Sequence, residues 1–584
     1  MEEQQELTVM FYFASDNPLA PLIISEIKAI KDAGFQEHTN VLVYFDPMEK
    51  GARTRVLDVN RDRRKREKTF IGDGDDPFVR HMSEDDVSDD ELTPDMLTAL
   101  SSTTEVKAVE SLTKFINFAL TKRPAKNYML FLIGHGMIVA NDAFLPDDAD
   151  HSAITLAQLK ETCGLFTKDG QSSLRLLSLH SCSMSSVEVA YQLRGTADFM
   201  LATQGTAFVN GWPYRQLLKK TLNQVNRAQQ DALQQARRHN QNEKEAVANA
   251  RVNYDELVRK IYFLCIHNFT DFLTGGYSCD LVLCSLEPAR LEALKQPLQG
   301  LVSALKSEMA EKASLVKNLV LLAHWDAQSF WSENYTDLWD FCDRLRSRCD
   351  ETIQMLPNTD ANNSLSAKLG SISTLCGQVK NALAPESATG GGAGGIVQFA
   401  DNCGSDFQYG RGLSVYFPWA EPLDDERATL NAPDEQSEQR EAKAETILQK
   451  YALYDFTKEF GDASWFSFLK AYFEGTKREP RHFPKKRFFD DGTAGVGLAP
   501  GVPPPTPIGI AFETAKGEFK DALLLKKTPE LKKTPEVGAD CTCPSIKNYP
   551  TMDDLRIKDF FITPGALTSF LIPGTAERNP AEDE

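Results

Sequence analysis

Five short apolar segments near the start of the chain constrain its fold more than any other sequence feature. Each is nearly continuous in apolar character, as is usual for β-strands that are covered on both faces. Segments with helical periodicity separate them, and this alternation predicts a mostly parallel sheet between two layers of helices. The predicted strands are residues 7–13, 41–45, 127–133, 174–179 and 199–203, and the predicted helices are residues 19–33, 105–121, 155–163 and 185–194.

The chain divides into four parts by composition. Residues 1–213 are the predicted α/β core, and residues 214–274 lack Gly and Pro entirely, which predicts a long helical insertion. Residues 275–480 return to an α/β pattern, with predicted strands at 281–284 and 413–417. Residues 481–584 hold 13 of the 29 prolines, a composition typical of an extended, partly disordered tail.

The net charge and the cysteines of the chain limit which partners and which cellular location we expect. The formal net charge of −19 repels phosphate backbones and anionic lipids, so we expect neither nucleic acid nor membrane as a partner. The first residues are acidic and lack the basic segment of a signal peptide, which predicts a cytoplasmic location. The 11 cysteines show neither a disulfide framework nor zinc-ligand spacing, and we expect most to be buried free thiols.

A histidine and a cysteine follow two of the predicted strands. The strand at 127–133 is followed by Gly134, His135 and Gly136, and the strand at 174–179 is followed by His180, Ser181 and Cys182. The carboxyl ends of neighbouring parallel strands meet at one edge of a sheet, and 47 residues are about what one crossover helix and a loop require. An imidazole beside a thiol generates a thiolate nucleophile, and the dipole of a helix after Cys182 lowers the thiol pKa further.

Gly136 completes this candidate site. It lacks a side chain, so its backbone N–H can approach a substrate carbonyl and form an oxyanion hole together with the N–H of Cys182. The alternative is a core cysteine at a strand end and an unrelated loop histidine. The shared position of His135 and Cys182 at strand ends favours catalysis over that alternative.

Several segments in a consistent order resemble the clostripain family of cysteine peptidases, within the caspase-like clan. The resemblance spans roughly residues 7–475 and implies a caspase-like three-layer α/β/α sandwich, with His135 as the catalytic base and Cys182 as the nucleophile of an endopeptidase. The similar segments are LTVMFYFASDN (7–17), VLVYFDP (41–47), FLIGHG (131–136), LPDDADHSAITLAQL (145–159), CSMSSVEVAYQL (182–193), ADFMLATQ (197–204), GWPY (211–214) and GLSVYFP (412–418).

The sequence also departs from the family pattern. The family typically carries an Asp two residues before the nucleophile, where it lines the S1 pocket and selects Arg or Lys at P1; here that position is His180. We therefore expect His180 to form the S1 wall and basic P1 residues not to be preferred. Residues 137–159, where relatives are often cleaved after a basic residue, contain no Lys or Arg.

The chemistry of a Cys–His pair requires no cofactor. Calcium, which some relatives use, is an open alternative with Asp147, Asp148 and Asp150 as weak candidate ligands. Protein or peptide substrates are expected as partners, together with an activating or inhibitory protein, because an intracellular protease must be restrained. The rival hypothesis is a catalytically inactive scaffold that binds partners through the helical insertion and the tail.

Overall fold

A computed structural model describes most of the chain before residue 477. The predicted tail, together with Asp148 and Asp150, lies outside the described residues. Described are residues 4–14, 20–34, 36–45, 55–59, 108–136, 142–147, 152–168, 170, 172–208, 211–269, 278–310, 315–330, 334–357, 359–384, 394–404, 406–419 and 447–476.

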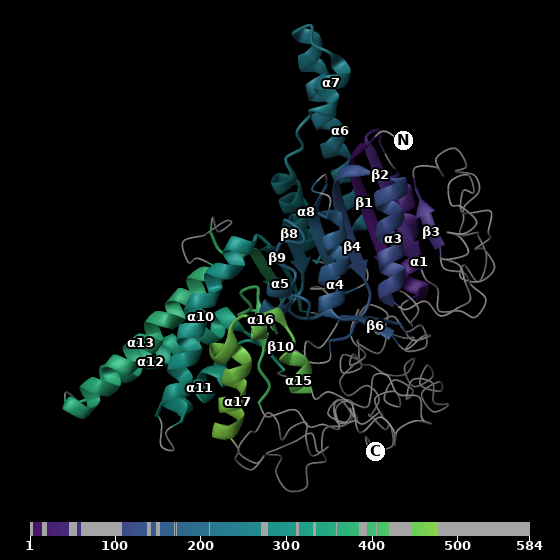
Figure 1. Cartoon of the computed structure of the whole chain (residues 1–584). Coiled ribbons are helices and arrows are strands. Elements are labelled where there is room, and N and C mark those ends of the chain that lie inside the picture. The colour runs from purple at the N-terminus through teal and green to yellow at the C-terminus, as the bar shows by residue number, and fades with distance from the viewer. Residues whose placement is uncertain are drawn as a thin grey trace, which may run out of the picture.

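An eight-stranded, mostly parallel sheet forms the centre of the molecule (Figure 1). Its strand order is β12-β9-β8-β7-β4-β1-β2-β3, and the five strands from β8 to β2 are parallel to their neighbours within that block. Strands β3 and β9 are antiparallel to the block and extend it on its two sides. The strands are β1 (Gln5–Phe13), β2 (Thr39–Phe45), β3 (Arg55–Asp58), β4 (Ala125–Ile133), β7 (Ser173–His180), β8 (Phe199–Ala202), β9 (Cys279–Ser285) and β12 (Val397–Cys403).

Helices cover both faces of this sheet, as the sequence predicts. Alternate side chains of β1 enter two different cores: Met10 packs with Leu112 of α3 on one face, and Val9 packs with Ile27 of α1 on the other. The fold is therefore a three-layer α/β/α sandwich. The first face carries α3 (Ala108–Lys122), α4 (Leu156–Cys163) and α5 (Val187–Gln192), and the second carries α1 (Ala20–Ala33), α6 (Tyr214–Arg238) and α8 (Tyr254–Asn268).

The segment predicted as a second α/β region is mainly helical. It adds β9 and β12 to the main sheet and a small three-stranded sheet, while its long helices pack on one another, α12 against α13 and α10 against α13 and α17. The elements are α10 (Pro288–Met309), α11 (Leu315–Asp326), β10 (Ser329–Phe330), β11 (Tyr335–Asp337), α12 (Leu338–Met355), α13 (Asp360–Leu383), β13 (Ser414–Tyr416), α15 (Ile447–Tyr451), α16 (Asp455–Lys458) and α17 (Trp465–Thr476).

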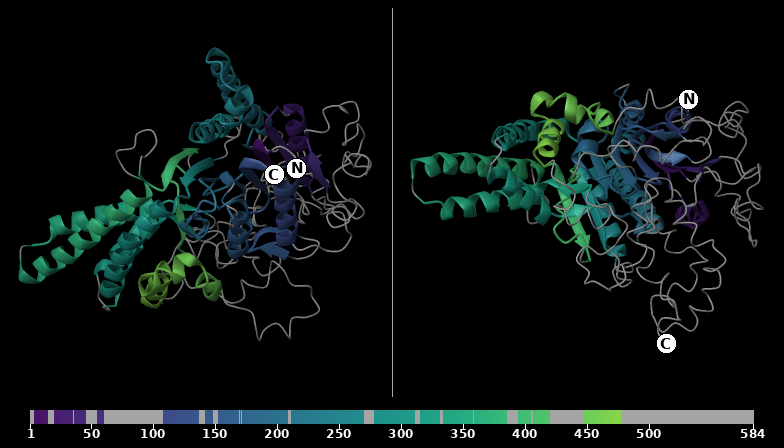
Figure 2. Two further views of the ribbon diagram at one scale, coloured as in Figure 1. Left: turned by 45° about the horizontal axis from the view of Figure 1, so that its top comes forward. Right: turned by 90° about the horizontal axis from the view of Figure 1, so that it is seen from below.

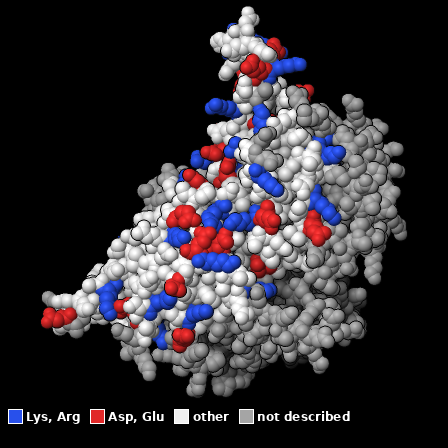
Figure 3. All heavy atoms as spheres, viewed as in Figure 1, with Lys and Arg blue, Asp and Glu red and all other residues white. Residues whose placement is uncertain are grey.

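Two helical arms extend away from the sheet (Figure 2). One consists of the far part of α6 with α7 (Glu243–Ala248), and the other is the antiparallel pair α12 and α13. No helix in the described part of the chain is long and apolar enough to cross a membrane. On the face seen in Figure 3, cationic and anionic side chains are interspersed, so this face has no broad region of one charge sign.

Candidate active site

The register of two neighbouring strands places His135 and Cys182 at the same level of the sheet. Strand β4 pairs with β7 in parallel, and the last paired residues are Ile133 and His180. His135 and Cys182 each come two residues after this pair, at the carboxyl edge of the sheet. The structure thus brings together the two residues that the sequence singled out.

Gly136 lies directly against the backbone of Cys182. A methyl group added at Gly136 would overlap the carbonyl of Cys182 and lie 2.9 Å from its backbone nitrogen. Only glycine permits this approach, which gives a physical reason for the Gly that follows His135. The predicted oxyanion role of the Gly136 and Cys182 N–H groups stays a prediction, because it depends on a bound substrate.

Cys182 is fully buried, and its sulfur accepts a hydrogen bond from the backbone. The N–H of Ala207 lies 3.0 Å from the Cys182 Sγ. The next residue, Ser183, has a φ of 59°, so the backbone is in the left-handed region directly after the cysteine. The thiol in turn donates to the Ala207 carbonyl at 3.7 Å. The N–H contact favours the ionised sulfur, and the carbonyl contact favours the protonated thiol.

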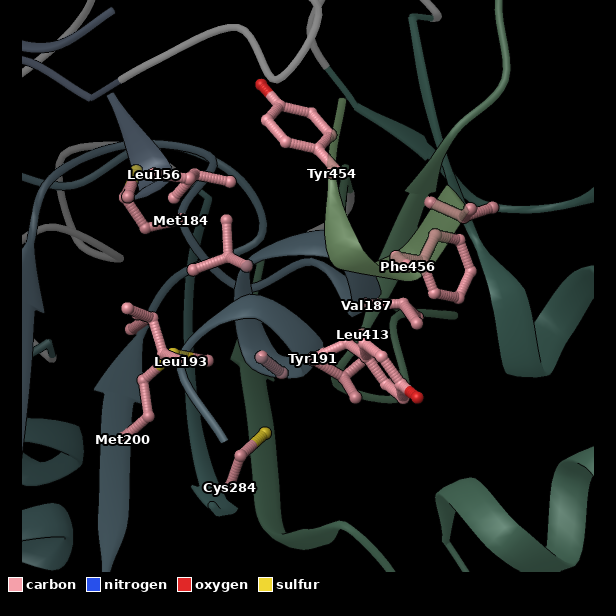
Figure 4. Packing of buried hydrophobic residues seen from close by; sticks show 14 of the residues in the cluster. Leu156, Met184, Val187, Tyr191, Leu193, Met200, Cys284, Leu413, Tyr454 and Phe456 are labelled. Carbon is pink, nitrogen blue, oxygen red and sulfur yellow. The ribbon is translucent and has the colours of Figure 1, made fainter. Parts of the chain in front are cut away.

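The helix after Cys182 differs from its predicted extent. The sequence predicted a helix over 185–194, whereas α5 spans Val187–Gln192 and is capped by the Ser186 side chain. Residues 183–186 instead run into the core, where Met184, Val187 and Tyr191 are buried (Figure 4). The N-terminus of α5 is thus separated from Cys182 by four residues, and the described N–H group at the sulfur belongs to Ala207.

His135 is uncharged at neutral pH. Burial lowers its pKa from the ordinary 6.5 to about 4, so the imidazole is neutral at pH 7 and able to accept a proton. Its Nδ1 is buried and has no hydrogen-bond partner among the described residues. Its backbone carbonyl accepts a hydrogen bond from the N–H of Leu145 at 3.2 Å.

His180, the predicted S1 wall, is fully buried and hydrogen-bonded at both ring nitrogens. Its Nε2 donates to the Phe208 carbonyl over 2.7 Å, so its Nδ1 accepts from the hydroxyl of Tyr214. The ring stacks on Trp212, with 4.1 Å between ring centroids. Burial lowers the His180 pKa to about 3, so the side chain is uncharged at neutral pH. Whether His180 faces the P1 side chain stays a prediction.

The candidate calcium ligands are only partly described. Asp147 is the last residue of strand β5 (Phe144–Asp147), which pairs with β6 (Ser152–Ile154) in a two-stranded sheet. Among the described residues, no group of three or more His, Cys, Asp or Glu side chains is placed to hold a metal ion. Calcium binding therefore stays an untested prediction.

A mostly parallel sheet with a histidine and a cysteine at the ends of adjacent strands is the arrangement of a cysteine hydrolase. The Clostripain family model matches residues 11–454, well over half of the 584 residues. The chain therefore belongs to the clostripain family of cysteine peptidases, as the sequence segments indicated.

Solved structures of cysteine proteases show low overall similarity to the chain. An inactive zymogen protease from Parabacteroides distasonis is 15% identical with a TM-score of 0.38, and the match covers 72% of this chain and 93% of that chain. A secreted cysteine protease from Bacteroides thetaiotaomicron, in complex with an irreversible peptide inhibitor, is 14% identical with a TM-score of 0.40, covering 80% and 99%. No curated protein matches the chain. Family membership rests on the family model.

The structure adds residues that sequence reasoning did not assign to the site. Ala207 and Phe208 contribute backbone atoms, to Cys182 and His180 respectively, and a backbone contact leaves no signal in residue type. Trp212 and Tyr214 surround His180 with their side chains. These two belong to the GWPY segment, which carried the resemblance but had no assigned role.

Proposed function

We propose that this clostripain-family protease uses His135 and Cys182 as its catalytic dyad. The observation that supports the assignment is the β4–β7 register, which carries both residues two positions beyond the pair Ile133 and His180. The packing of Gly136 on the Cys182 backbone is consistent with it. Neutral His135 accepts the thiol proton, and the Cys182 thiolate attacks the scissile carbonyl of a protein substrate.

The later steps follow from the same groups. The N–H groups of Gly136 and Cys182 stabilise the tetrahedral oxyanion. Protonated His135 then gives its proton to the leaving amine, and water hydrolyses the acyl-enzyme on Cys182 to release the second product. This chemistry requires neither metal nor cofactor, and the calcium alternative at Asp147, Asp148 and Asp150 would act outside it.

We further propose that P1 residues are not basic and that the enzyme works inside the cell under the control of processing or a protein partner. The uncharged His180 supplies no negative charge for a P1 guanidinium. All cysteines in the described residues are free thiols, which suits a reducing compartment. A protease that works inside the cell must be restrained, which is the reason to expect such control.

Cys182→Ala and His135→Ala test the dyad. Each should abolish cleavage of a peptide library while the melting temperature stays within about 5 °C of wild type, since members of one catalytic unit fail together. A thiol-reactive probe should label Cys182 in wild type and lose this label in Cys182→Ala. Residual cleavage above a few per cent in either variant would place the chemistry elsewhere.

The rival hypothesis is the inactive scaffold. The burial of Cys182 is the observation that favours it. A folded wild-type protein that cleaves no member of the library and whose Cys182 resists the probe would support the scaffold.

A further inference from the structure

One loop, residues 203–208, holds the turn that carries Cys182. The Gly205 carbonyl accepts the Ser183 N–H at 3.0 Å, and the Thr203 carbonyl accepts the Ser185 N–H at 2.8 Å. The Ala207 N–H reaches the Cys182 sulfur at 3.0 Å. The position of the nucleophile therefore depends on the position of the 203–208 loop.

Asp280 in β9 fixes this loop from the other side. Strand β8 pairs with β9 up to Ala202 and Val282, so two residues further on Gln204 lies opposite Asp280. There the side chain of Asp280, in place of its backbone, accepts the hydrogen bonds from the opposite segment. Its Oδ2 accepts the Gln204 N–H at 2.6 Å, and its Oδ1 accepts the Gly205 N–H at 2.9 Å. Both carboxylate oxygens are thus used by consecutive backbone donors of one loop.

The same loop is tightly packed around these bonds. A methyl group added at Gly205 would lie 2.6 Å from the ring of Phe407 and 3.0 Å from the Asp280 Oδ1. The Gln204 side chain donates to Asp337 at 2.9 Å and accepts from the Gly412 N–H at 3.1 Å. The loop therefore has little room to shift while the Asp280 bonds persist.

Burying a carboxylate at position 280 lowers the free energy of unfolding, which indicates that this carboxylate has a role. Asp280 is only 3% exposed, and burial raises its pKa to about 7, with repulsion from Asp337 adding to the shift. The other titratable groups in electrostatic contact with it are Cys279 and Tyr262. An Asn at this position would place its NH₂ group against one of the two N–H donors, so only a carboxylate satisfies both.

We propose that Asp280 is a positioning residue for the nucleophile: its carboxylate holds the 203–208 loop so that the Ala207 N–H stabilises the Cys182 thiolate. Asp280 touches neither substrate nor reacting atoms in this role. The inference rests on the proposed function of Cys182 as nucleophile. It predicts that loss of the Asp280 bonds raises the pKa of Cys182 without removing any group of the dyad.

The test is the pH dependence of Cys182 alkylation by iodoacetamide, read as mass increase of the peptide that contains Cys182. Asp280→Asn should move the midpoint of this profile to higher pH by about one unit, the size expected for a lost bond to a charged group. Asp340→Asn is the matched control. Asp340 is also 3% exposed and accepts a backbone N–H, from Gln328 at 2.7 Å, but has no described bond to the 203–208 loop.

Asp340→Asn should keep the wild-type midpoint. If Asp280→Asn does not fold, Asp280→Ser keeps one acceptor oxygen in a smaller side chain and should show a shift of the same sign. An unshifted midpoint in a folded Asp280 variant, or a wild-type Cys182 that iodoacetamide does not alkylate at any pH, overturns the inference. Because the test uses no substrate, a wild type that alkylates normally yet cleaves no peptide contradicts the proposed function and leaves the role of Asp280 intact.

Discussion

At the residue scale, His180 is the strand-end residue for which the sequence predicts a role in specificity. It occupies the position where the family pattern has Asp, and its ring is held between Trp212, Tyr214 and the Phe208 carbonyl. With both nitrogens bonded and its pKa lowered to about 3, it is neutral over the whole physiological range. A neutral ring does not replace a carboxylate beneath a guanidinium.

His180→Asp should shift the cleavage profile toward Arg and Lys at P1, because it restores a negative charge at this position. It should also lower the melting temperature, since the new carboxylate is buried and loses the stack on Trp212. His180→Asn is the neutral control and should not favour basic P1 residues. Cleavage after Arg by the unmutated enzyme at least about a hundredfold faster than after every neutral residue would contradict the prediction.

Gly136→Ala should abolish cleavage and destabilise the fold by about 1–3 kcal/mol, because the added methyl group overlaps the Cys182 backbone. Gly370→Ala is the matched control: it lies inside helix α13 with open space around it. That change should keep full activity and stabilise the protein by about 0.5–1 kcal/mol. Denaturant unfolding and peptide cleavage measure both effects, and an active Gly136→Ala enzyme would exclude the close contact.

The candidate site was predictable where residue type and strand position coincide. His135, Gly136 and Cys182 could be singled out because each lies two or three residues after a strand, and the β4–β7 register places these strand ends at the same level of the sheet. The Ala207 N–H and Asp280 were not found. A backbone donor is independent of residue type, and Asp280 acts across about 75 residues through a strand pairing that no local pattern specifies.

At the scale of elements, the buried carboxylate of Asp337 links β11, α12 and the 203–208 loop. Asp337 caps α12 through the Asp340 N–H and also accepts the Arg411 N–H and the Gln204 side chain. Burial raises its pKa from 3.8 to about 6. The folded state therefore binds a proton at Asp337 more tightly than the unfolded chain does, and this contribution to stability is lost as pH rises from about 4 through 6.

The free energy of unfolding of the wild type should fall between pH 4 and pH 7. Asp337→Asn should make this fall smaller by on the order of 2 kcal/mol, since Asn caps helices but does not titrate in this range. Denaturant unfolding at the two pH values measures it. The neighbouring Thr336→Val, also fully buried but without a titratable group, should keep the wild-type pH dependence. An identical pH dependence in Asp337→Asn and wild type would show that Asp337 does not titrate in the folded protein.

The strands of the core were easier to predict than the second half of the chain. Continuous apolar runs identified β1, β2, β4, β7 and β8, because strands buried on both faces have no polar alternation. Residues 275–480 contain both predicted strands, as β9 and β13, and the described part of this segment also holds long helices and the strands β10, β11 and β12. Its strands β9 and β12 join a sheet whose other members lie far away in the sequence, which a local pattern does not reveal.

At the scale of the whole molecule, the composition of the chain changes after residue 480, since residues 481–584 hold 13 of the 29 prolines. The match ends at residue 454 and the last described helix ends at Thr476. Truncation after Arg481 should therefore leave a soluble protein with nearly unchanged helix content by circular dichroism. It should also alter activity or partner binding, because residues 508–512 and 560–572 are apolar patches that need a partner. Unfolding of the truncated protein would make the tail structural, and behaviour identical to full length in every assay would exclude a regulatory tail.

The turn that carries Cys182 is completed by a segment more than 200 residues later in the chain. Ser185 donates from its side chain to the Gly412 carbonyl, and its own carbonyl accepts the Ser414 N–H. During synthesis on the ribosome the nucleophile is made early, but these partners emerge only after the whole insertion and the α12–α13 arm have been translated. A growing chain that has not yet reached residue 414 therefore lacks two of the hydrogen bonds that hold Ser185, three residues after Cys182.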